Sequence, residues 1–324
     1  MRLLVTGSSG HLGEALVRVL RTQGRDVVGL DARPSPTTDL VGSVTDRALV
    51  REAVSRAGAV LHTATLHKPD VRTSSRQDFV DTNVTGTLAL LEESAAAGVG
   101  AFVLTSTTST YGRALTPPDG EPAVWVDEDL VPVPRNVYGA TKRAAEDLGE
   151  LVARDEGLPV VVLRASRFFP EGDDREDVRR SGPAANVKAN ELLHRRVDLQ
   201  DVVDAHLLAV ERAPALGHAR YVVSAPTPFT RADAPRLRVD APGLVRSRFP
   251  DQPALYAQQG WRVPDGIERV YDSSRAQREL GWRPRYDFRH LLDSLAAGED
   301  PRSPLARQVG AKGYHGAPTW PGTT

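Results

Sequence analysis

The stretch Arg2-Leu-Leu-Val-Thr-Gly-Ser-Ser-Gly-His-Leu-Gly13 is followed at once by Glu14-Ala-Leu-Val-Arg-Val-Leu20. Its first five residues form an apolar run that predicts a buried strand, and the apolar spacing from Glu14 onward predicts a helix. The glycines between them permit a tight turn in which side chains do not cover the backbone amides. A phosphate can then lie at the N-terminus of the helix, so this order predicts a dinucleotide-binding unit.

The turn residues have separate uses in this interpretation. Gly7 and Gly10 keep the turn tight and open, and Gly13 lets the helix approach the strand closely. We assign three further residues of the turn to the same cofactor site: Ser9, His11 and Leu12.

A second strand-like run ends at Asp31, 18 residues beyond Gly13. An acidic residue at this place accepts hydrogen bonds from the adenosine ribose and repels a 2′-phosphate, which favours NAD over NADP. Arg33 could neutralise such a phosphate, but a solvated loop arginine is the preferred interpretation.

Composition limits the class of protein. The chain has 324 residues, 40% of them hydrophobic, which is enough for one large core or two unequal lobes. Its formal net charge of -1 gives no field that would attract nucleic acid or an anionic membrane. No cysteine is present, no apolar run approaches the roughly 18 residues of a membrane span, and a signal peptide has no room before Arg2. We expect a cytoplasmic protein that acts on a small molecule and holds no metal.

Short β-branched runs alternate with helical stretches, which is typical of right-handed crossovers on a parallel sheet. We therefore predict an α/β fold, a doubly wound Rossmann-type parallel sheet with a smaller interleaved C-terminal lobe. Strands are expected at 2–6, 25–31, 59–62, 101–106, 158–165 and 219–224. The clearest helices are expected at 77–97 and 136–155.

The alternation weakens after Gly172, and this sets the expected lobes. Residues 1–170, joined by roughly 195–225, should form the dinucleotide-binding domain, whereas 171–194 and 226–306 should form the substrate lobe. We expect a long loop over a cleft at residues 113–134. We expect a tail at residues 307–324. Trp261 and Trp282 belong either to the core or to the substrate lobe.

Tyr138 and Lys142 lie four residues apart within the second helix, so the phenol and the ammonium share one helical face. A phenol that titrates near pH 10 is a poor base at neutral pH, and a fixed ammonium with a nicotinamide cation favours the phenolate. Hydroxyl side chains gather at the end of a strand in Leu104-Thr-Ser-Thr-Thr-Ser-Thr-Tyr-Gly112. A hydroxyl there could orient a substrate oxygen toward the tyrosine.

In this order the motifs resemble the extended short-chain dehydrogenase/reductase family, the group of NAD-dependent epimerases and dehydratases, and within it the nucleotide-sugar 4-epimerases. The resemblance covers residues 1–288. Besides the motifs above, it is carried by Val60-Leu-His62-Thr-Ala64, Asn83-Val-Thr-Gly86, Leu163-Arg164, Asp201-Val-Val-Asp204 and Glu279-Leu-Gly-Trp282.

The resemblance implies roles for single residues. Thr107 would be the catalytic hydroxyl, Tyr138 the acid/base, Lys142 the ribose-binding activator, and Asn83 a support for the active-site helix. Further contacts to the cofactor are implied for His62, Thr63, Ala64, Thr105 and Ser106, and contacts to the substrate for Thr107, Thr108, Arg167 and Arg196. Such proteins usually pair through the helices that carry Asn83 and Tyr138, which implies a homodimer.

Departures from the family pattern narrow the reaction. Dehydratases place Asp-Glu directly after the catalytic threonine, and decarboxylases usually keep the glutamate; here these positions hold Thr108 and Ser109. The reactions that remain are a single hydride transfer between substrate and cofactor, or a hydride transfer to the cofactor followed by its return to the substrate. The first hypothesis is therefore an NAD-dependent sugar or nucleotide-sugar epimerase, and the second an NAD-dependent sugar or sugar-acid dehydrogenase. A third, a cofactor-binding regulator without turnover, would predict a damaged catalytic set.

Arginines mark the expected substrate side. Arg167 stands near the position where nucleotide-sugar enzymes have an asparagine, and only about two dozen residues separate Gly172 from Arg195, which leaves little chain to grip a nucleotide. Arg167 could clamp a phosphate or carboxylate together with Arg175, Arg179 and Arg180. A solvated charged helix over 173–180 is the simpler alternative.

Overall fold

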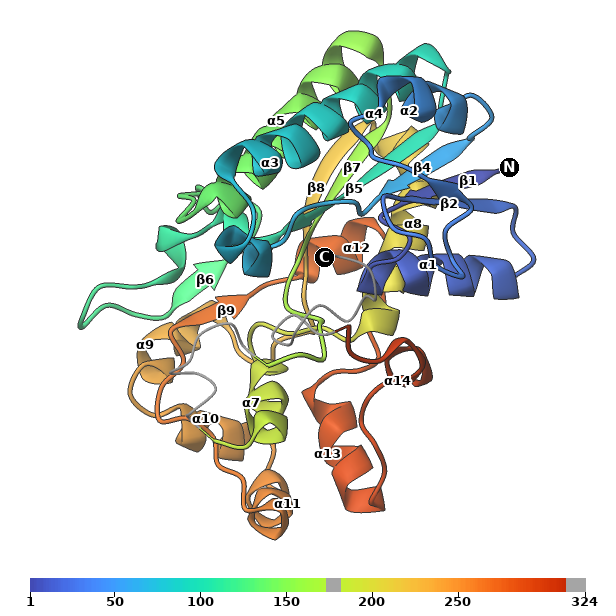
Figure 1. Cartoon of the computed structure of the whole chain (residues 1–324). Coiled ribbons are helices and arrows are strands. Elements are labelled where there is room, and N and C mark those ends of the chain that lie inside the picture. Colours follow the sequence, from blue (N-terminus) through green and yellow to red (C-terminus); the bar gives the residue numbers. More distant parts are fainter. Residues whose placement is uncertain (173–181, 313–324) are drawn as a thin grey trace.

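The computed structural model describes residues 1–172 and 182–312, and in it seven strands form one parallel sheet (Figure 1). The strand order is β3-β2-β1-β4-β5-β7-β8, and each neighbouring pair is parallel. The order reverses between β1 and β4, as in other doubly wound sheets. The strands are β1 Leu3–Thr6, β2 Val27–Asp31, β3 Leu40–Val41, β4 Ala59–His62, β5 Ala101–Thr107, β7 Val160–Ala165 and β8 His218–Val223.

Helices cover both faces of this sheet (Figure 1). On one face α1 His11–Thr22, α8 Leu199–Leu216 and α12 Ser274–Glu279 bury one apolar cluster. On the other face α2 Arg47–Val54, α4 Gly86–Ala96 and α5 Val137–Glu156 bury a second cluster. Each central strand is mostly apolar and almost entirely buried because both of its faces are covered. The expected fold class is confirmed.

The helix expected at 77–97 has a break that its periodicity does not show. It consists of α3 Arg76–Val80, a π-helical turn at Asp81–Thr85, and α4. A π turn inserts one residue into the helical ladder and re-aims the side chains near it, and such turns are frequent at functional sites. Asn83 lies within this turn.

The smaller lobe lies below the carboxyl ends of the strands of the sheet (Figure 1). Its core is a separate apolar cluster to which Leu193, Leu237 and Phe288 belong. Its elements are α7 Ala184–Glu191, α9 Ala234–Leu237, α10 Ala241–Arg248, α11 Gln252–Gln259, α13 Phe288–Ala297 and the two-stranded parallel sheet of β6 Val124–Val126 and β9 Arg269–Tyr271.

Three expectations about boundaries need correction. The segment 113–134 contains β6, which pairs with β9 over a long sequence separation that local patterns do not show. Residues 274–282, expected in the small lobe, pack on the sheet instead: Trp282 is fully buried there and its Nε1 donates to the carbonyl of Asp201 at 2.9 Å. The expected tail does not begin as an irregular segment, because its first residues belong to helix α14, Pro304–Val309. This helix packs on α1 and α8.

Buried neutral histidines make stability depend on pH. The Nδ1 of His206 donates to the carbonyl of Val202, and its Nε2 accepts from the hydroxyl of Thr105, both at 2.8 Å. Burial lowers the pKa of His206 from 6.5 to about 4, with the bond to Val202 acting against it. Below pH 6.5 the unfolded chain therefore binds a proton that the folded protein does not.

We expect His206→Gln to flatten the loss of stability on acidification. The wild-type free energy of unfolding should fall more steeply than that of the variant between pH 6.5 and pH 4, by up to about 1.4 kcal/mol per pH unit. Urea unfolding at a series of pH values measures both slopes. Equal slopes would show that His206 does not take part in this linkage.

Candidate active site

The glycine turn after β1 fits a bound dinucleotide. Gly7 has a φ of 72°, which favours glycine, and a Cβ at Gly13 would lie 2.0 Å from the carbonyl oxygen of Gly7. Side chains are thus excluded where α1 begins, and its backbone amides stay open to a pyrophosphate. Gly7, Gly10, His11, Leu12 and Gly13 all line one cavity.

Asp31 lies at the carboxyl end of β2, beside this turn. Its Oδ2 accepts from the amide of Ser9 and its Oδ1 from the amide of Arg33, both at 2.9 Å. The carboxylate is therefore held in place at the end of the strand, where an adenosine ribose would lie. This geometry supports the expected choice of NAD over NADP.

The glycine turn and the expected catalytic groups share connected cavities. Thr107 and Tyr138 line the cavity of the glycine turn and also a second cavity of about 200 Å³, here called the reaction cavity, which faces the small lobe. The Thr107 side chain lies near enough to the phenol of Tyr138 to lower its pKa. The structure thus brings the phenol, the threonine hydroxyl and the cofactor turn together.

Burial dominates the electrostatics of the catalytic pair. It raises the pKa of Tyr138 to about 12, while the Thr107 side chain lowers this pKa and the charge of Asp70 raises it. Burial lowers the pKa of Lys142 to about 8, and the carboxylate of Glu146 acts in the opposite direction. In the protein alone at neutral pH the phenol is protonated and the ammonium is charged.

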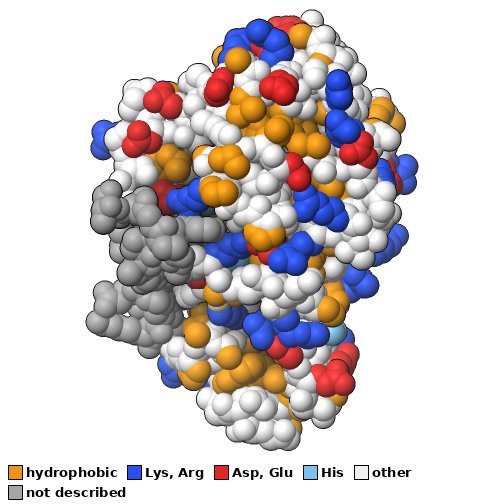
Figure 2. Space-filling view, turned by 45° about the vertical axis from the view of Figure 1, so that its right-hand side comes forward, with side chains coloured by type: hydrophobic (Ala, Val, Ile, Leu, Met, Phe, Trp, Pro, Cys, Tyr) orange, Lys and Arg blue, Asp and Glu red, His pale blue; other side chains and the backbone are white. Residues whose placement is uncertain are grey.

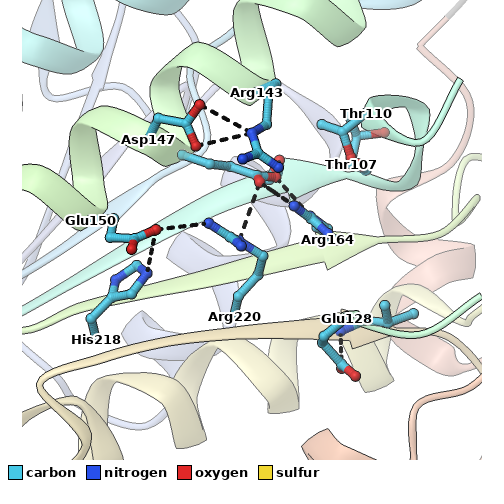
Figure 3. Close-up of polar contacts among 12 residues, drawn as sticks. Thr107, Thr110, Glu128, Arg143, Asp147, Glu150, Arg164, His218 and Arg220 are labelled. Atoms are coloured by element: carbon cyan, nitrogen blue, oxygen red, sulfur yellow. Dashed lines mark hydrogen bonds and ion pairs between the residues drawn. The ribbon is translucent and has the colours of Figure 1, made fainter. Parts of the chain in front are cut away.

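A buried ion pair fixes the helix that carries both groups. Glu146, one turn beyond Lys142, accepts from Arg164 Nη2 at 2.6 Å and from Ser106 Oγ at 2.5 Å, and neither Glu146 nor Arg164 is exposed. Burial lowers the pKa of Arg164, but the bonds and charge of Glu146 outweigh this and raise it. In Figure 3 Arg164 and Arg220 approach the same carboxylate, which Arg220 Nε reaches at 3.3 Å.

Asn83 ties the active-site helix to the loop after β4. Its Oδ1 accepts from the amide of Leu66 at 2.8 Å and from Thr65 Oγ1 at 2.9 Å, and its Nδ2 donates to Thr141 Oγ1 at 3.1 Å. Thr141 belongs to α5 and lies between Tyr138 and Lys142. This agrees with a supporting role.

The other expected cofactor residues differ in their placement. Thr63 and Thr105 line the cavity of the glycine turn, as does Ser106. The amide of Ala64 lies 3.3 Å from Thr6 Oγ1. His62 is fully buried, and its ring bonds Thr6 at 2.7 Å and Thr87 at 2.9 Å, so it supports the cleft from within the core.

The expected substrate residues differ in their placement. Thr108 and Arg167 line the reaction cavity. Arg196 is buried, and its Nε donates to Glu191 at 2.8 Å while its Nη1 donates to the carbonyl of Phe169 at 3.0 Å, so it supports the cavity from behind. The other arginines of the expected clamp, Arg175, Arg179 and Arg180, lie outside the described residues.

Sequence patterns gave no signal for several residues of the reaction cavity. Phe169, Arg195, Arg269 and Tyr271 line it, and so does His67. Burial lowers the pKa of His67 to about 4, with the charges of Lys142 and His11 in the same direction and that of Asp70 opposed. Arg269 and Tyr271 come from β9, far from the nucleotide-binding motifs in sequence, and only the folded lobe brings them to the site.

Comparison with known proteins agrees with this fold and site. A sequence model of the family described as "NAD dependent epimerase/dehydratase family" matches residues 3–223. The chain belongs to this family, and it is therefore an NAD-dependent enzyme with an extended short-chain dehydrogenase/reductase fold.

Individual relatives span most of the chain. The dTDP-glucose 4,6-dehydratase of Streptomyces antibioticus is 30% identical over 89% of either chain. The UDP-glucose 4-epimerase of Rhizobium meliloti (strain 1021) is 26% identical and covers 90% of this chain and 95% of its own. The solved structure of MoeE5 in complex with UDP-glucose and NAD has a TM-score of 0.62, with 25% identity over 91% of this chain and 96% of that one.

None of the described helices is both long and apolar enough to cross a bilayer.

We expect Arg164→Met to destabilise the protein by about 3–5 kcal/mol, because it leaves the Glu146 carboxylate buried without its main partner. The double variant Arg164→Met with Glu146→Gln should recover much of this loss. Denaturant unfolding at neutral pH measures the free energies. As a control, Arg143→Met removes an exposed pair with Asp147 on the same helix and should cost less than about 1 kcal/mol. Equal losses in the two single variants would contradict the role given to the buried pair.

Proposed function

We propose that this enzyme transfers a hydride at a carbinol carbon of a sugar or nucleotide sugar, as an epimerase. The observation that carries this proposal is the cavity arrangement: Tyr138 and Thr107 both line the cavity of the glycine turn and the reaction cavity. One pair of hydroxyls can thus face a cofactor on one side and a substrate on the other.

The residues of the chain have distinct tasks in this proposal. Gly7, Gly10 and Gly13 leave room for NAD, which when bound supplies the hydride acceptor. Tyr138 takes the proton from the substrate hydroxyl and returns it, and Thr107 holds the same oxygen by a hydrogen bond. Burial disfavours the phenolate form of Tyr138. We assign to the Lys142 ammonium, one helical turn away, the task of favouring this phenolate.

The segment after Thr107 supports hydride chemistry over dehydration. Thr108 and Ser109 follow it in a short 3₁₀ turn, and the amide of Ser109 donates to Thr107 Oγ1 at 3.1 Å. Neither side chain can act as the carboxyl acid or carboxylate base that elimination of water requires. Net dehydrogenation of a sugar or sugar acid is the second candidate, because it uses the same Tyr138, Thr107 and Lys142.

The product distinguishes the two candidates. We expect sugars and nucleotide sugars incubated with the enzyme and NAD to yield an epimer without net NADH, and Tyr138→Phe to slow this by about 10²–10⁴-fold because the proton acceptor is lost. Chromatography of the products and absorbance of NADH give the two readouts. Stoichiometric NADH would assign the dehydrogenase instead, and full activity of Tyr138→Phe would refute the acid/base role. Retained NAD binding by the variant serves as the control for folding.

We further propose that the enzyme is a homodimer that pairs through α3, α4 and α5. Leu151 and Val80 are 41% and 39% exposed, and a shallow depression lined by Val84, Leu148 and Leu151 lies on this face. An exposed apolar strip on two adjacent helices is typical of a surface that a second copy covers.

Leu151→Glu should convert the dimer to a monomer, because it places a charge in the apolar strip. Sedimentation velocity measures the change, and Val239→Glu, at a residue that is 78% exposed and remote from this strip, is the matched control. A wild-type protein that sediments as a monomer would contradict the proposal.

A further inference from the structure

Three arginines from separate parts of the chain line the same cavity as the reacting groups. Arg167 follows β7, Arg195 follows α7, and Arg269 begins β9 in the small lobe; all three line the reaction cavity beside Tyr138 and Thr107. Arg167 lies close to the reacting centre, because it comes two residues after Ala165, which pairs with Thr107 across β5 and β7. In the view of Figure 2 Lys and Arg side chains are frequent across the middle of the molecule, between its upper and lower parts.

A single buried carboxylate holds two of these arginines in position. Glu191 is 3% exposed, and it lies 2.8 Å from Arg195 Nη2, 2.8 Å from Arg196 Nε and 3.8 Å from Arg167 Nε. Burial raises the pKa of Glu191, but the three arginine charges outweigh this and bring it to about 2, so Glu191 stays ionised. One negative charge thus lies beside three guanidinium groups, two of which, those of Arg167 and Arg195, line the reaction cavity.

Arg269 adds a donor that the described chain does not satisfy. Its side chain is only 13% exposed, its Nη1 donates to the carbonyl of Leu115 at 3.3 Å, and its Nε is buried without a hydrogen-bond partner. A buried guanidinium N–H without a partner is costly, and an acceptor in the cavity would relieve this cost. Arg269 and Arg195 also line a neighbouring cavity of about 430 Å³, so they stand where two compartments of the cleft meet.

We propose that Arg167, Arg195 and Arg269 bind a carboxylate of the substrate, and that the substrate is therefore a sugar acid rather than a neutral sugar. Guanidinium groups bind carboxylates in bidentate geometry, and a neutral hexose ring offers no charge to match them. This inference rests on the proposed function, because it takes Tyr138 and Thr107 as the reacting centre. Because Arg167 lies close to that centre, it can reach a carboxylate that is attached directly to the sugar ring.

Matched substrate pairs test the proposal in the NAD-loaded full-length enzyme. UDP-glucuronic acid and UDP-glucose differ only at the carboxylate, as do free glucuronate and glucose, and glucose 6-phosphate carries a phosphate instead. We expect the acid of each pair to be preferred by about tenfold or more in kcat/KM, which is the factor that one charged hydrogen bond contributes. Equal or better use of the neutral sugar overturns the proposal, and preference for glucose 6-phosphate over glucuronate overturns the carboxylate in favour of a phosphate.

Variants identify the residue responsible. Arg269→Leu should abolish the preference mainly through KM, and Arg269→Lys should retain part of it. Arg236→Leu, which removes an exposed arginine paired with Asp240, should leave the preference unchanged. A preference that survives Arg269→Leu overturns the role of Arg269. If Arg269→Leu does not fold, the partial loss in Arg269→Lys remains the test, and an unchanged preference there has the same meaning.

Calorimetric binding separates this inference from the proposed function. Titration of glucuronate and of glucose into the wild-type enzyme measures the preference without turnover. Binding of glucuronate that Arg269→Leu weakens, with no turnover of any sugar, would support the carboxylate site and refute the proposed hydride transfer. Turnover without preference for the acid would support the proposed hydride transfer and refute the carboxylate site.

Discussion

The ion pair between Glu146 and Arg164 is the contact on which the site depends. Glu146 belongs to α5, Arg164 to β7, and Ser106, which also donates to Glu146, to β5. The pair thus joins the helix that carries Tyr138 to two adjacent strands, one of which, β5, ends at Thr107. Because both charges are fully buried, neither can leave the other without a large cost in free energy.

The parallel sheet explains why the site lies where it does. All strands of the large sheet point the same way, so their carboxyl ends lie at one edge, and the glycine turn, Asp31 and Thr107 are found there. The small lobe lies below this edge (Figure 1). The cleft is therefore bounded by the strand ends and the glycine turn on the cofactor side and by a separately packed lobe on the substrate side.

Charge is distributed unequally across this cleft. Burial lowers the pKa values of His62 and His67 to about 3 and about 4. Neither imidazole therefore carries a positive charge at physiological pH. On the substrate side Glu191 is surrounded by arginines and remains ionised. A substrate that carries negative charge fits this distribution better than a neutral one.

The sequence by itself determined the sheet and the cofactor turn, because these depend on local rules such as a strand before glycines and an acid after the second strand. A four-residue spacing on one helix likewise led to the prediction of Tyr138 and Lys142 as catalytic residues. It did not show the π turn at Asn83, the pairing of β6 with β9, or the packing of residues 274–282 against the sheet. Those features depend on contacts between residues far apart in the chain, which no periodicity records. For the same reason only the tertiary structure brought Arg269 and Arg167 to the lining of one cavity.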